Sequence, residues 1–338
     1  MTIAVYVDDL FITGNDSTAM ESLIDALRDR YKDLKIVRGK VHNYLGMVLN
    51  FTRPAHVTVS QAGMILDITR GKPLDAVIPH TPGAKHSPSK TPAPGYLFEV
   101  SPDLLLLSPI DRAIVHRTAA QPLFVGTHSR PDIVLANSFH TKRVLSPTLE
   151  DSRKLERTLS YLENTANLAL TLQCHLPPRV YTFIDAAHAV HPDMKGHTGV
   201  CVTLGTGMLY SKSTSQKINT TSSCQSELVA LAKGLQQSIW IRSFLIGQGY
   251  PKMPISVYQD NTSTIKLVEN GRSTSELSRH ISIGYFWIHD LIKRGVITVE
   301  YCPTEDMVAD FFTKPLQGSL FLKLRNLVMG ETETINKK

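Results

Sequence analysis

Acids that follow or interrupt apolar segments constrain the fold of this 338-residue chain most. The strand-like segment 180–184 ends on Asp185, and the apolar segment 255–258 is followed closely by Asp260. A strand that ends on an acid holds its carboxylate at the rim of a sheet, where a ligand can reach it. One such acid alone would be typical of a solvated turn, whereas several acids in similar positions would indicate a shared site.

Two further acids lie in segments with a helical pattern. Leucines and isoleucines recur at spacings of three and four over residues 223–246, which predicts a helix with one buried stripe. Glu227 lies beside that stripe in an early turn, where the helix dipole favours an anion. Asp310 lies in a short predicted helix that begins at Thr304 and stops before Pro315. Together with the two strand-end acids, these residues favour a carboxylate cluster.

A carboxylate cluster is most useful as a metal site. Hard oxygen ligands suit Mg²⁺ or Mn²⁺. Two such ions about 4 Å apart can hold the attacking water and the leaving oxygen of a phosphodiester. Without metal, two carboxylates about 4 Å apart repel each other by about 4 kcal/mol at an effective dielectric constant of about 20. We therefore expect the four acids to bind metal.

Composition narrows the class of protein and its partners. The formal net charge of +6 and the pI near 9.0 mildly favour a polyanionic partner. The four cysteines show no CxxC spacing, which argues against zinc ribbons and disulfide scaffolds and favours a reducing compartment, cytoplasmic or nuclear. No apolar run reaches 18 residues, so we expect no membrane span.

The order of these features resembles the ribonuclease H domain of Ty1/copia retrotransposon polyproteins. The phrases that carry the resemblance are SSCQSELVAL, YQDNTSTI, RHISIGYFWIHDLIKRG and VEYCPTEDMVADFFTKPLQG. The resemblance covers nearly the whole chain. It implies cleavage of the RNA strand of an RNA–DNA hybrid, with two Mg²⁺, or Mn²⁺ instead, as cofactor. The catalytic and metal-binding residues would be Asp185, Glu227, Asp260 and Asp310.

The same resemblance names candidate substrate contacts, which are Asn261, Arg279 and His280. Family members usually carry an acid after the equivalent His-Ile pair, but Ser282 stands there in this chain. This difference leaves the chemical role of His280 open.

The N-terminal residues 2–13 predict two apolar strands joined at Val7-Asp8-Asp9. The phrase YVDD resembles the corresponding box of reverse transcriptases, in which Asp8, with Asp9 beside it, would belong to a polymerase metal site. The partner acid of that site lies upstream in the family, and this chain begins after it. We therefore expect no polymerase activity from this chain alone, and we expect the upstream part of the polyprotein as a further partner.

These observations predict an α+β fold made of a truncated reverse-transcriptase palm, a helical connection and a ribonuclease H-like mixed β-sheet flanked by helices. Eight prolines between positions 73 and 109 indicate an extended surface connector. The expected units are the palm at 1–71, the Pro-rich connector at 72–108, the helical connection at 109–178, the ribonuclease H-like domain at 179–325 and a disordered tail at 326–338. Lysines and arginines of the helical connection are expected to be available to the nucleic-acid backbone.

Several alternatives remain open at this stage. Asp306 lies four residues before Asp310, on the same face of the predicted helix, and competes with it as the fourth ligand. His188, His191 and His197 are compatible with a zinc site or with a polar loop. For the whole chain, the alternatives are a decayed retroelement remnant that at most binds nucleic acid and a transposase-type nuclease on the same core.

Overall fold

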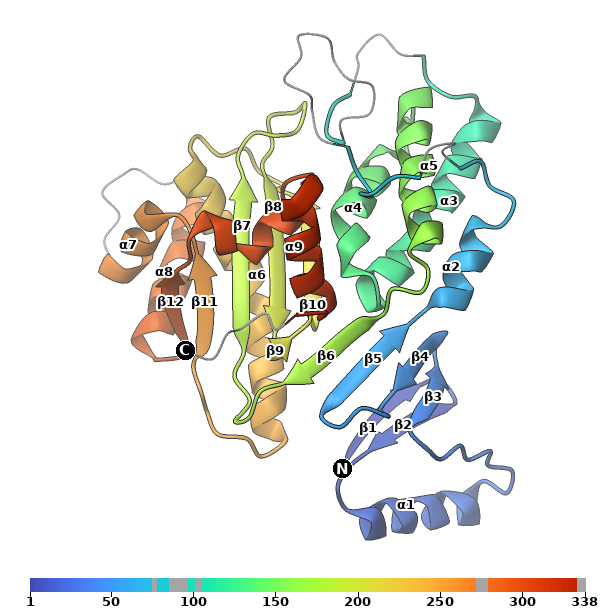
Figure 1. Ribbon diagram of the computed structural model, residues 1–338. Coiled ribbons are helices and arrows are strands. Elements are labelled where there is room, and N and C mark those ends of the chain that lie inside the picture. The colour runs from blue at the N-terminus through green and yellow to red at the C-terminus, as the bar shows by residue number, and fades with distance from the viewer. Residues whose placement is uncertain (75–77, 85–96, 101–104, 272–278, 333–338) are drawn as a thin grey trace.

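The computed structural model describes residues 1–74, 78–84, 97–100, 105–271 and 279–332, with no side-chain description for residues 279–282. The chain forms the expected α+β fold, in which a mixed sheet, a group of helices and an N-terminal lobe lie next to one another (Figure 1). Within the described residues, no helix is both long enough and apolar enough to span a membrane.

The central sheet has the strand order β10-β8-β7-β11-β12. The first three strands along the chain are antiparallel, and the last two run parallel to β7, so the sheet is mixed as expected. The strands are β7 (Tyr181–Ala187), β8 (His197–Thr203), β10 (Tyr210–Ser215), β11 (Ile255–Gln259) and β12 (Ile297–Tyr301).

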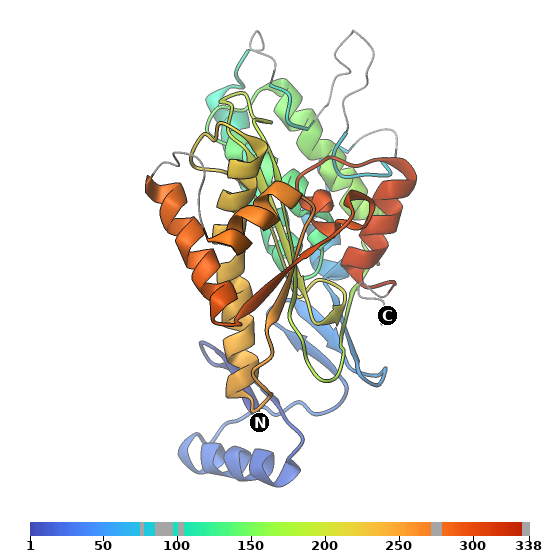
Figure 2. The same ribbon diagram turned by 90° about the vertical axis from the view of Figure 1, so that its left-hand side faces the viewer.

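Helices cover both faces of this sheet (Figure 2). One face carries α6 (Ser223–Gly247), α7 (Thr262–Asn270) and α8 (Arg279–Lys293). The other face carries the 3₁₀ segment η3 (Val308–Phe312) and the helix α9 (Gly318–Met329). Because Val328 and Met329 are buried, this domain continues past residue 325, and the expected disordered tail begins too early.

A second sheet, β3-β4-β5-β6-β9, joins the N-terminal lobe (residues 1–60) to the rest of the chain. In this sheet β5 pairs with β6, and β6 pairs in turn with β9. Backbone hydrogen bonds therefore connect the expected palm to the C-terminal half of the chain. Its strands are β3 (Val41–Tyr44), β4 (Met47–Asn50), β5 (His56–Ser60), β6 (Leu170–Cys174) and β9 (Gly205–Thr206).

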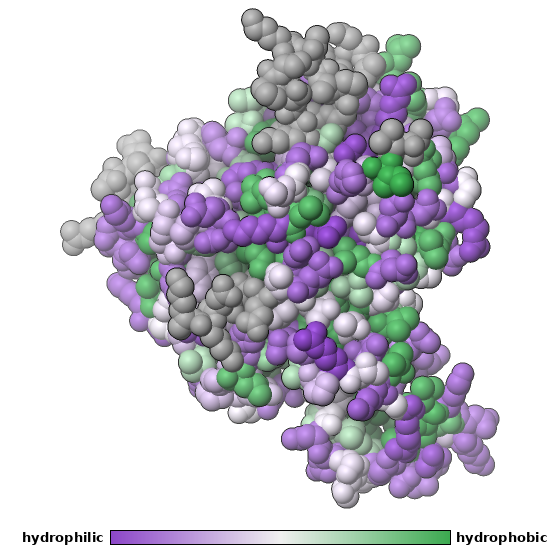
Figure 3. All heavy atoms as spheres, in the orientation of Figure 1, coloured by the Kyte–Doolittle hydropathy of each residue, from purple (hydrophilic) through white to green (hydrophobic). Residues whose placement is uncertain are grey.

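The N-terminal lobe is completed by the predicted hairpin and a helix. The hairpin consists of β1 (Thr2–Tyr6) and β2 (Asp9–Thr13), and it forms a separate two-stranded sheet. The helix α1 (Ser17–Arg30) has no buried residue, and Asp16 caps it by accepting a hydrogen bond from the Ala19 amide. In Figure 3 this lobe stands apart from the main body and mixes hydrophobic with hydrophilic surface.

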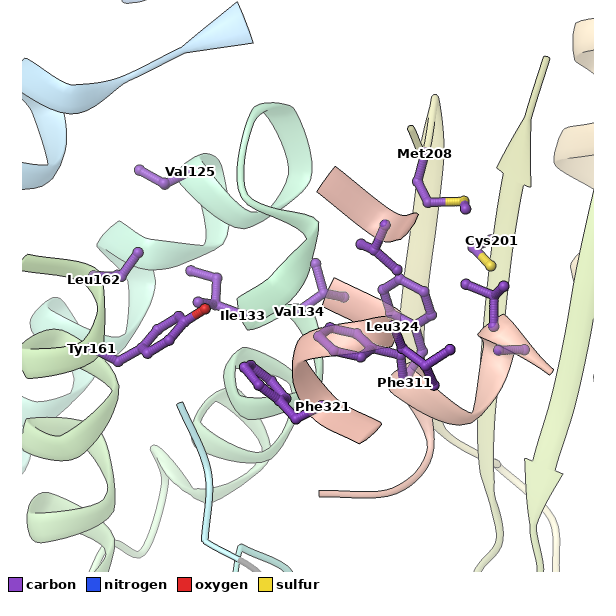
Figure 4. Packing of buried hydrophobic residues seen from close by; sticks show 14 of the residues in the cluster. Val125, Ile133, Val134, Tyr161, Leu162, Cys201, Met208, Phe311, Phe321 and Leu324 are labelled. Carbon is purple, nitrogen blue, oxygen red and sulfur yellow. The ribbon is translucent and has the colours of Figure 1, made fainter. Parts of the chain in front are cut away.

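The helical connection packs into the same core as the sheet. Its elements, with α2 before them, are α2 (Ala62–Thr69), α3 (Pro109–His128), η1 (Pro131–Ile133), α4 (Val134–Arg143) and α5 (Leu149–Asn164). Figure 4 shows one cluster of apolar side chains that runs from Leu162 on α5 through Phe321 on α9 to Cys201 on β8. The expected border at residue 178 therefore does not separate two cores.

Two described stretches correct other expectations. Leu97 and Phe98, inside the expected surface connector, are buried against Phe139 of α4. Of the basic side chains of the helical connection that were expected to be available to nucleic acid, Arg130 is not available, because it is fully buried and pairs with Asp132 at 2.7 Å. The hydroxyl of Tyr161 donates a hydrogen bond to the same carboxylate, so this network fixes the start of α4 on α5.

Candidate metal centre

Two parallel strands bring the first two acids side by side. In β11 and β7, Tyr258 pairs with Phe183, so Asp260 and Asp185 lie two residues further along at the same level. Parallel neighbours at equal level lie about 5 Å apart. The strand β7 continues to Ala187, which places Asp185 inside the strand near its end.

The third acid reaches the sheet because a glycine leaves room for it. Asp185 pairs across β7 and β8 with Gly199, and η3 passes directly over this glycine. A Cβ atom at position 199 would lie 2.7 Å from Thr313 Cγ2 and 2.8 Å from the Ala309 carbonyl oxygen. These distances are too short for any side chain, so glycine allows η3 to hold Asp310 next to Asp185.

The structure brings Asp185, Asp260 and Asp310 together, with one carboxylate oxygen of each within 4.8 Å of the others. Asp185 and Asp310 are buried and Asp260 is half-buried, so the cluster opens to solvent on the Asp260 side. Among the described residues, no other group of three or more potential ligands forms. Glu227, also buried, lies on α6 close enough to Asp185 to be affected by its charge.

Burial and mutual repulsion raise the pKa values of these acids. Burial, followed by the charge of Asp185, raises the pKa of Glu227 to about 9 and that of Asp310 to about 7. The pKa of Asp260 is raised by the same two causes in the same order. The metal-free site therefore holds protons near neutral pH, because it lacks enough positive charge to balance four carboxylates.

Each acid has its own hydrogen-bond donor, and sequence reasoning missed all four donors. Thr313 donates to Asp185, and Thr304 donates to Asp260 at 3.3 Å. The Lys314 ammonium lies 2.6 Å from an Asp310 oxygen, and Gln259 Nε2 donates to Glu227 at 3.1 Å. Thr313 and Lys314 belong to the TKP phrase that follows Asp310, which was the available signal. Gln259 and Thr304 had no signal apart from their position next to the acids.

The predicted helix over residues 304–314 is wrong. Extended backbone at Met307 separates two short 3₁₀ segments, η2 (Thr304–Asp306) and η3. Asp306 is therefore not on the face that carries Asp310; its side chain is 62% exposed and pairs with Lys323 on α9. The geometry separates the two candidates, because only Asp310 belongs to the cluster.

The other predicted site residues belong to the hairpin tip and to the starts of α7 and α8. Asp8 and Asp9 lie at the exposed tip of the hairpin, and no group of three potential ligands in the described chain includes them. Asn261 caps α7 by accepting a hydrogen bond from the Thr264 amide. Arg279 and His280 begin α8, but their side chains lie outside the described residues.

The three histidines of the 188–197 loop do not form a zinc site with other ligands. His191 Nε2 lies 2.9 Å from His197 Nδ1, and His197 Nε2 lies 2.6 Å from the Ser213 hydroxyl. His188 interacts with the hydroxyls of Thr220 and Ser226 instead. A buried polar network accounts for these residues, and none of them belongs to a group of three ligands within the described chain.

Several curated proteins with similar sequences are polyproteins of transposons. The chain is 29% identical over 323 residues to the retrovirus-related Pol polyprotein from transposon RE1 of Arabidopsis thaliana, covering 94% of the chain and 21% of that relative. It is 23% identical over 343 residues to the truncated transposon Ty1-A Gag-Pol polyprotein of Saccharomyces cerevisiae, covering 96% and 28%. The chain thus spans a fifth to somewhat over a quarter of these relatives. No family model matches the sequence.

Solved structures agree on the fold. A foamy viral protease-reverse transcriptase in complex with RNA/DNA hybrid matches 94% of this chain and 37% of its own, with a TM-score of 0.53 at 15% identity. A second structure of that protein, in complex with double-stranded DNA, matches with a TM-score of 0.50. The resemblance noted in the sequence is thereby confirmed: the homologues of this chain are Ty1/copia-type retrovirus-related Pol polyproteins, and the chain matches a part of such a polyprotein.

Proposed function

We propose that this chain is a metal-dependent endonuclease of ribonuclease H type that cleaves the RNA strand of RNA–DNA hybrids. The observation that carries the proposal is the meeting of Asp185, Asp260 and Asp310 from three separate segments, with Glu227 beside them. Homology to retroelement Pol polyproteins supports a nuclease of this general kind.

The donor set fits a hard divalent cation. All four side chains offer carboxylate oxygens, the ligand type of Mg²⁺ and Mn²⁺, and among the described residues no sulfur or imidazole belongs to the group. The oxygens of three acids already lie within 4.8 Å of one another, although burial and repulsion oppose their ionisation. Lys314 supplies one positive charge at this site, which leaves most of the negative charge to be balanced by bound cations.

When bound, a pair of Mg²⁺ ions would supply activation of a water and stabilisation of the leaving 3′ oxygen. The residues of the chain position the ligands. Thr313 orients Asp185, Thr304 orients Asp260 and Gln259 orients Glu227 through the hydrogen bonds described above. Since Asp310 and Glu227 hold protons in the metal-free state, metal binding releases protons, and the affinity for metal should rise with pH.

The hybrid is the substrate that the family resemblance implies. Such a fold recognises a hybrid by its shape, its 2′-hydroxyls and its phosphates, and the net charge of +6 suits that backbone. The half-buried side of the cluster, at Asp260, is where a phosphodiester could approach.

The test is a cleavage assay on an RNA–DNA hybrid, duplex RNA and duplex DNA, with Mg²⁺, Mn²⁺ or EDTA. We expect cleavage of the hybrid alone, in the RNA strand and only with metal. Asp260→Asn should abolish cleavage, because it removes one charge at nearly constant shape, while the circular dichroism spectrum stays that of the wild type.

The other outcomes identify the alternatives. A wild-type protein that binds the hybrid but never cuts it would be a decayed remnant, and preferential cleavage of duplex DNA would indicate a transposase-type nuclease. Cleavage in EDTA, or full activity of Asp260→Asn, would refute the assignment of the site.

A further inference from the structure

A groove of about 570 Å³ lies between the helical connection and β10, the edge strand of the central sheet. One wall comes from α3 and α4, and the other from residues 211–217, which belong to β10 and the loop after it. Four lysines line this groove, hereafter the β10 groove: Lys142, Lys195, Lys212 and Lys217. Among the described residues that line it, none is acidic.

The β10 groove keeps an excess of positive charge. Asp193 lies nearby and pairs with both Lys195, at 2.9 Å, and Lys142, at 3.4 Å. The single carboxylate of Asp193 is thus shared by the ammonium groups of Lys142 and Lys195. Within the described part of the chain, Lys212 and Lys217 are exposed and form no ion pair.

The pKa of a neighbouring lysine is affected by the same positive charges. Burial, followed by the positive charges of Lys217 and Lys212, lowers the pKa of Lys233 on α6. The three ammonium groups are therefore close enough to repel one another. Such a concentration of positive charge is unfavourable unless a polyanion offsets it.

The uncharged lining suits phosphate as well. Hydroxyl groups of Ser211, Thr214 and Ser215 on the strand, with Thr127 and Thr141 on the helices, face this space. Lysine ammonium groups and Ser or Thr hydroxyls are the side chains that contact phosphate oxygens in nucleic-acid complexes. Four ammonium groups beside these hydroxyls suit an anionic ligand.

The register of the sheet puts the β10 groove level with the carboxylate cluster. Asp185 pairs with Gly199, and Gly199 pairs with Ser213 of β10, so two strand spacings of about 5 Å separate them. The two places therefore lie about 10 Å apart across the sheet, so one duplex can contact both.

We propose that the β10 groove binds the phosphodiester backbone of a duplex nucleic acid while the same duplex lies at the carboxylate cluster. The proposal rests on the proposed function for the identity of the duplex, an RNA–DNA hybrid. Lys212 and Lys217 make the main contacts, because Lys142 and Lys195 already share Asp193. A competing explanation is that lysines on an edge strand only prevent pairing with another chain.

The test measures binding of a fluorescein-labelled RNA–DNA hybrid to the full chain by anisotropy, in EDTA and over a series of salt concentrations. Lys212→Ala/Lys217→Ala should weaken binding on the order of tenfold at moderate salt and lower the salt slope by about 2. The matched control is Lys252→Ala/Lys293→Ala. It removes two exposed lysines that precede β11 and β12, at the end of these strands away from Asp260, and it should bind like the wild type.

Lys212→Arg/Lys217→Arg retains the charge and should also bind like the wild type, which separates an electrostatic role from a structural one. An unchanged slope in the alanine variant, or an equal loss in the control, would overturn the proposal and leave edge protection as the role of these lysines. Because EDTA prevents metal-dependent cleavage, the binding result stands or falls independently of the cleavage assay.

Discussion

Replacement of Asp310 by asparagine should stabilise the metal-free protein at alkaline pH. In the folded state, burial and the charge of Asp185 raise the pKa of this carboxyl from 3.8 to about 7. In the unfolded chain the carboxyl ionises at its ordinary pKa, so ionisation favours unfolding once the pH exceeds about 4. The asparagine amide does not ionise in this pH range and avoids this cost.

The magnitude follows from the two pKa values. A rise from 3.8 to about 7 corresponds to about 4 kcal/mol at about 1.4 kcal/mol per pH unit. Asp310 shares its site with other carboxylates, so this figure is an upper limit for one side chain. The pKa of about 7 already includes the favourable Lys314 ion pair, so this pair is not subtracted again. We expect Asp310→Asn to gain about 2 kcal/mol at pH 8 in EDTA.

The sign of the pH dependence is part of the prediction. The folded wild type binds more protons than the unfolded chain between about pH 4 and pH 7, so its free energy of unfolding falls as the pH rises through that range. Glu227, with its pKa raised to about 9, extends the fall to higher pH. Asp310→Asn should lack the part of this decrease in the free energy of unfolding that occurs between about pH 4 and pH 7.

Urea unfolding at pH 5 and pH 8, followed by circular dichroism in EDTA and in excess Mg²⁺, measures these quantities. Mg²⁺ should stabilise the wild type at pH 8 and stabilise Asp310→Asn much less, since one ligand charge is lost. Asp306→Asn is the matched control, because Asp306 is exposed and outside the cluster, and it should change none of these responses. A wild type that becomes more stable from pH 5 to pH 8 in EDTA would refute the reasoning.

Three further substitutions test separate parts of the structure. Gly199→Ala should cripple hybrid cleavage, since its Cβ would push η3 and Asp310 away from Asp185; wild-type activity would contradict this geometry. Arg130→Met should cost about 3–5 kcal/mol in urea unfolding, because it leaves Asp132 buried and unpaired; a loss below about 1 kcal/mol would show that the pair is dispensable. Lys314→Met should lower stability at pH 8 in EDTA by up to about 1 kcal/mol and increase the stabilisation by Mg²⁺, and calorimetric titration that finds weaker Mg²⁺ binding would contradict this role.

The sequence predicted a cluster of four acids because each acid ends or interrupts a local apolar pattern, and the structure brings three of them within 4.8 Å of one another. Apolar runs that end on acids give Asp185 and Asp260 their places, and parallel pairing of β7 with β11 then brings them level. The helical spacing around Glu227 likewise predicted α6 almost to the residue. These local patterns place each acid on its element, but they do not specify which strands pair.

The borders of the units could not be predicted because long-range pairing decides them. The strand β6, after the helical connection, pairs with β5 in the N-terminal lobe, more than 100 positions earlier in the chain. Likewise, Leu162 of the expected helical connection shares one core with Phe321 and Cys201 of the expected ribonuclease H-like domain (Figure 4). Local composition indicates where the chain turns, but it does not indicate which distant segments pack into one hydrophobic core.

The choice between Asp306 and Asp310 shows the same limit at the scale of one turn. A continuous helix would place both acids on one face, and this was the expectation from their spacing. The extended backbone at Met307 breaks that helix, and Met307 itself is fully buried. Burial of this side chain in the shared core offers a reason for the break, since it anchors the chain between η2 and η3. The break rotates Asp306 toward Lys323 and solvent and leaves Asp310 facing the sheet, so the packing of one methionine selects which acid can serve as a ligand.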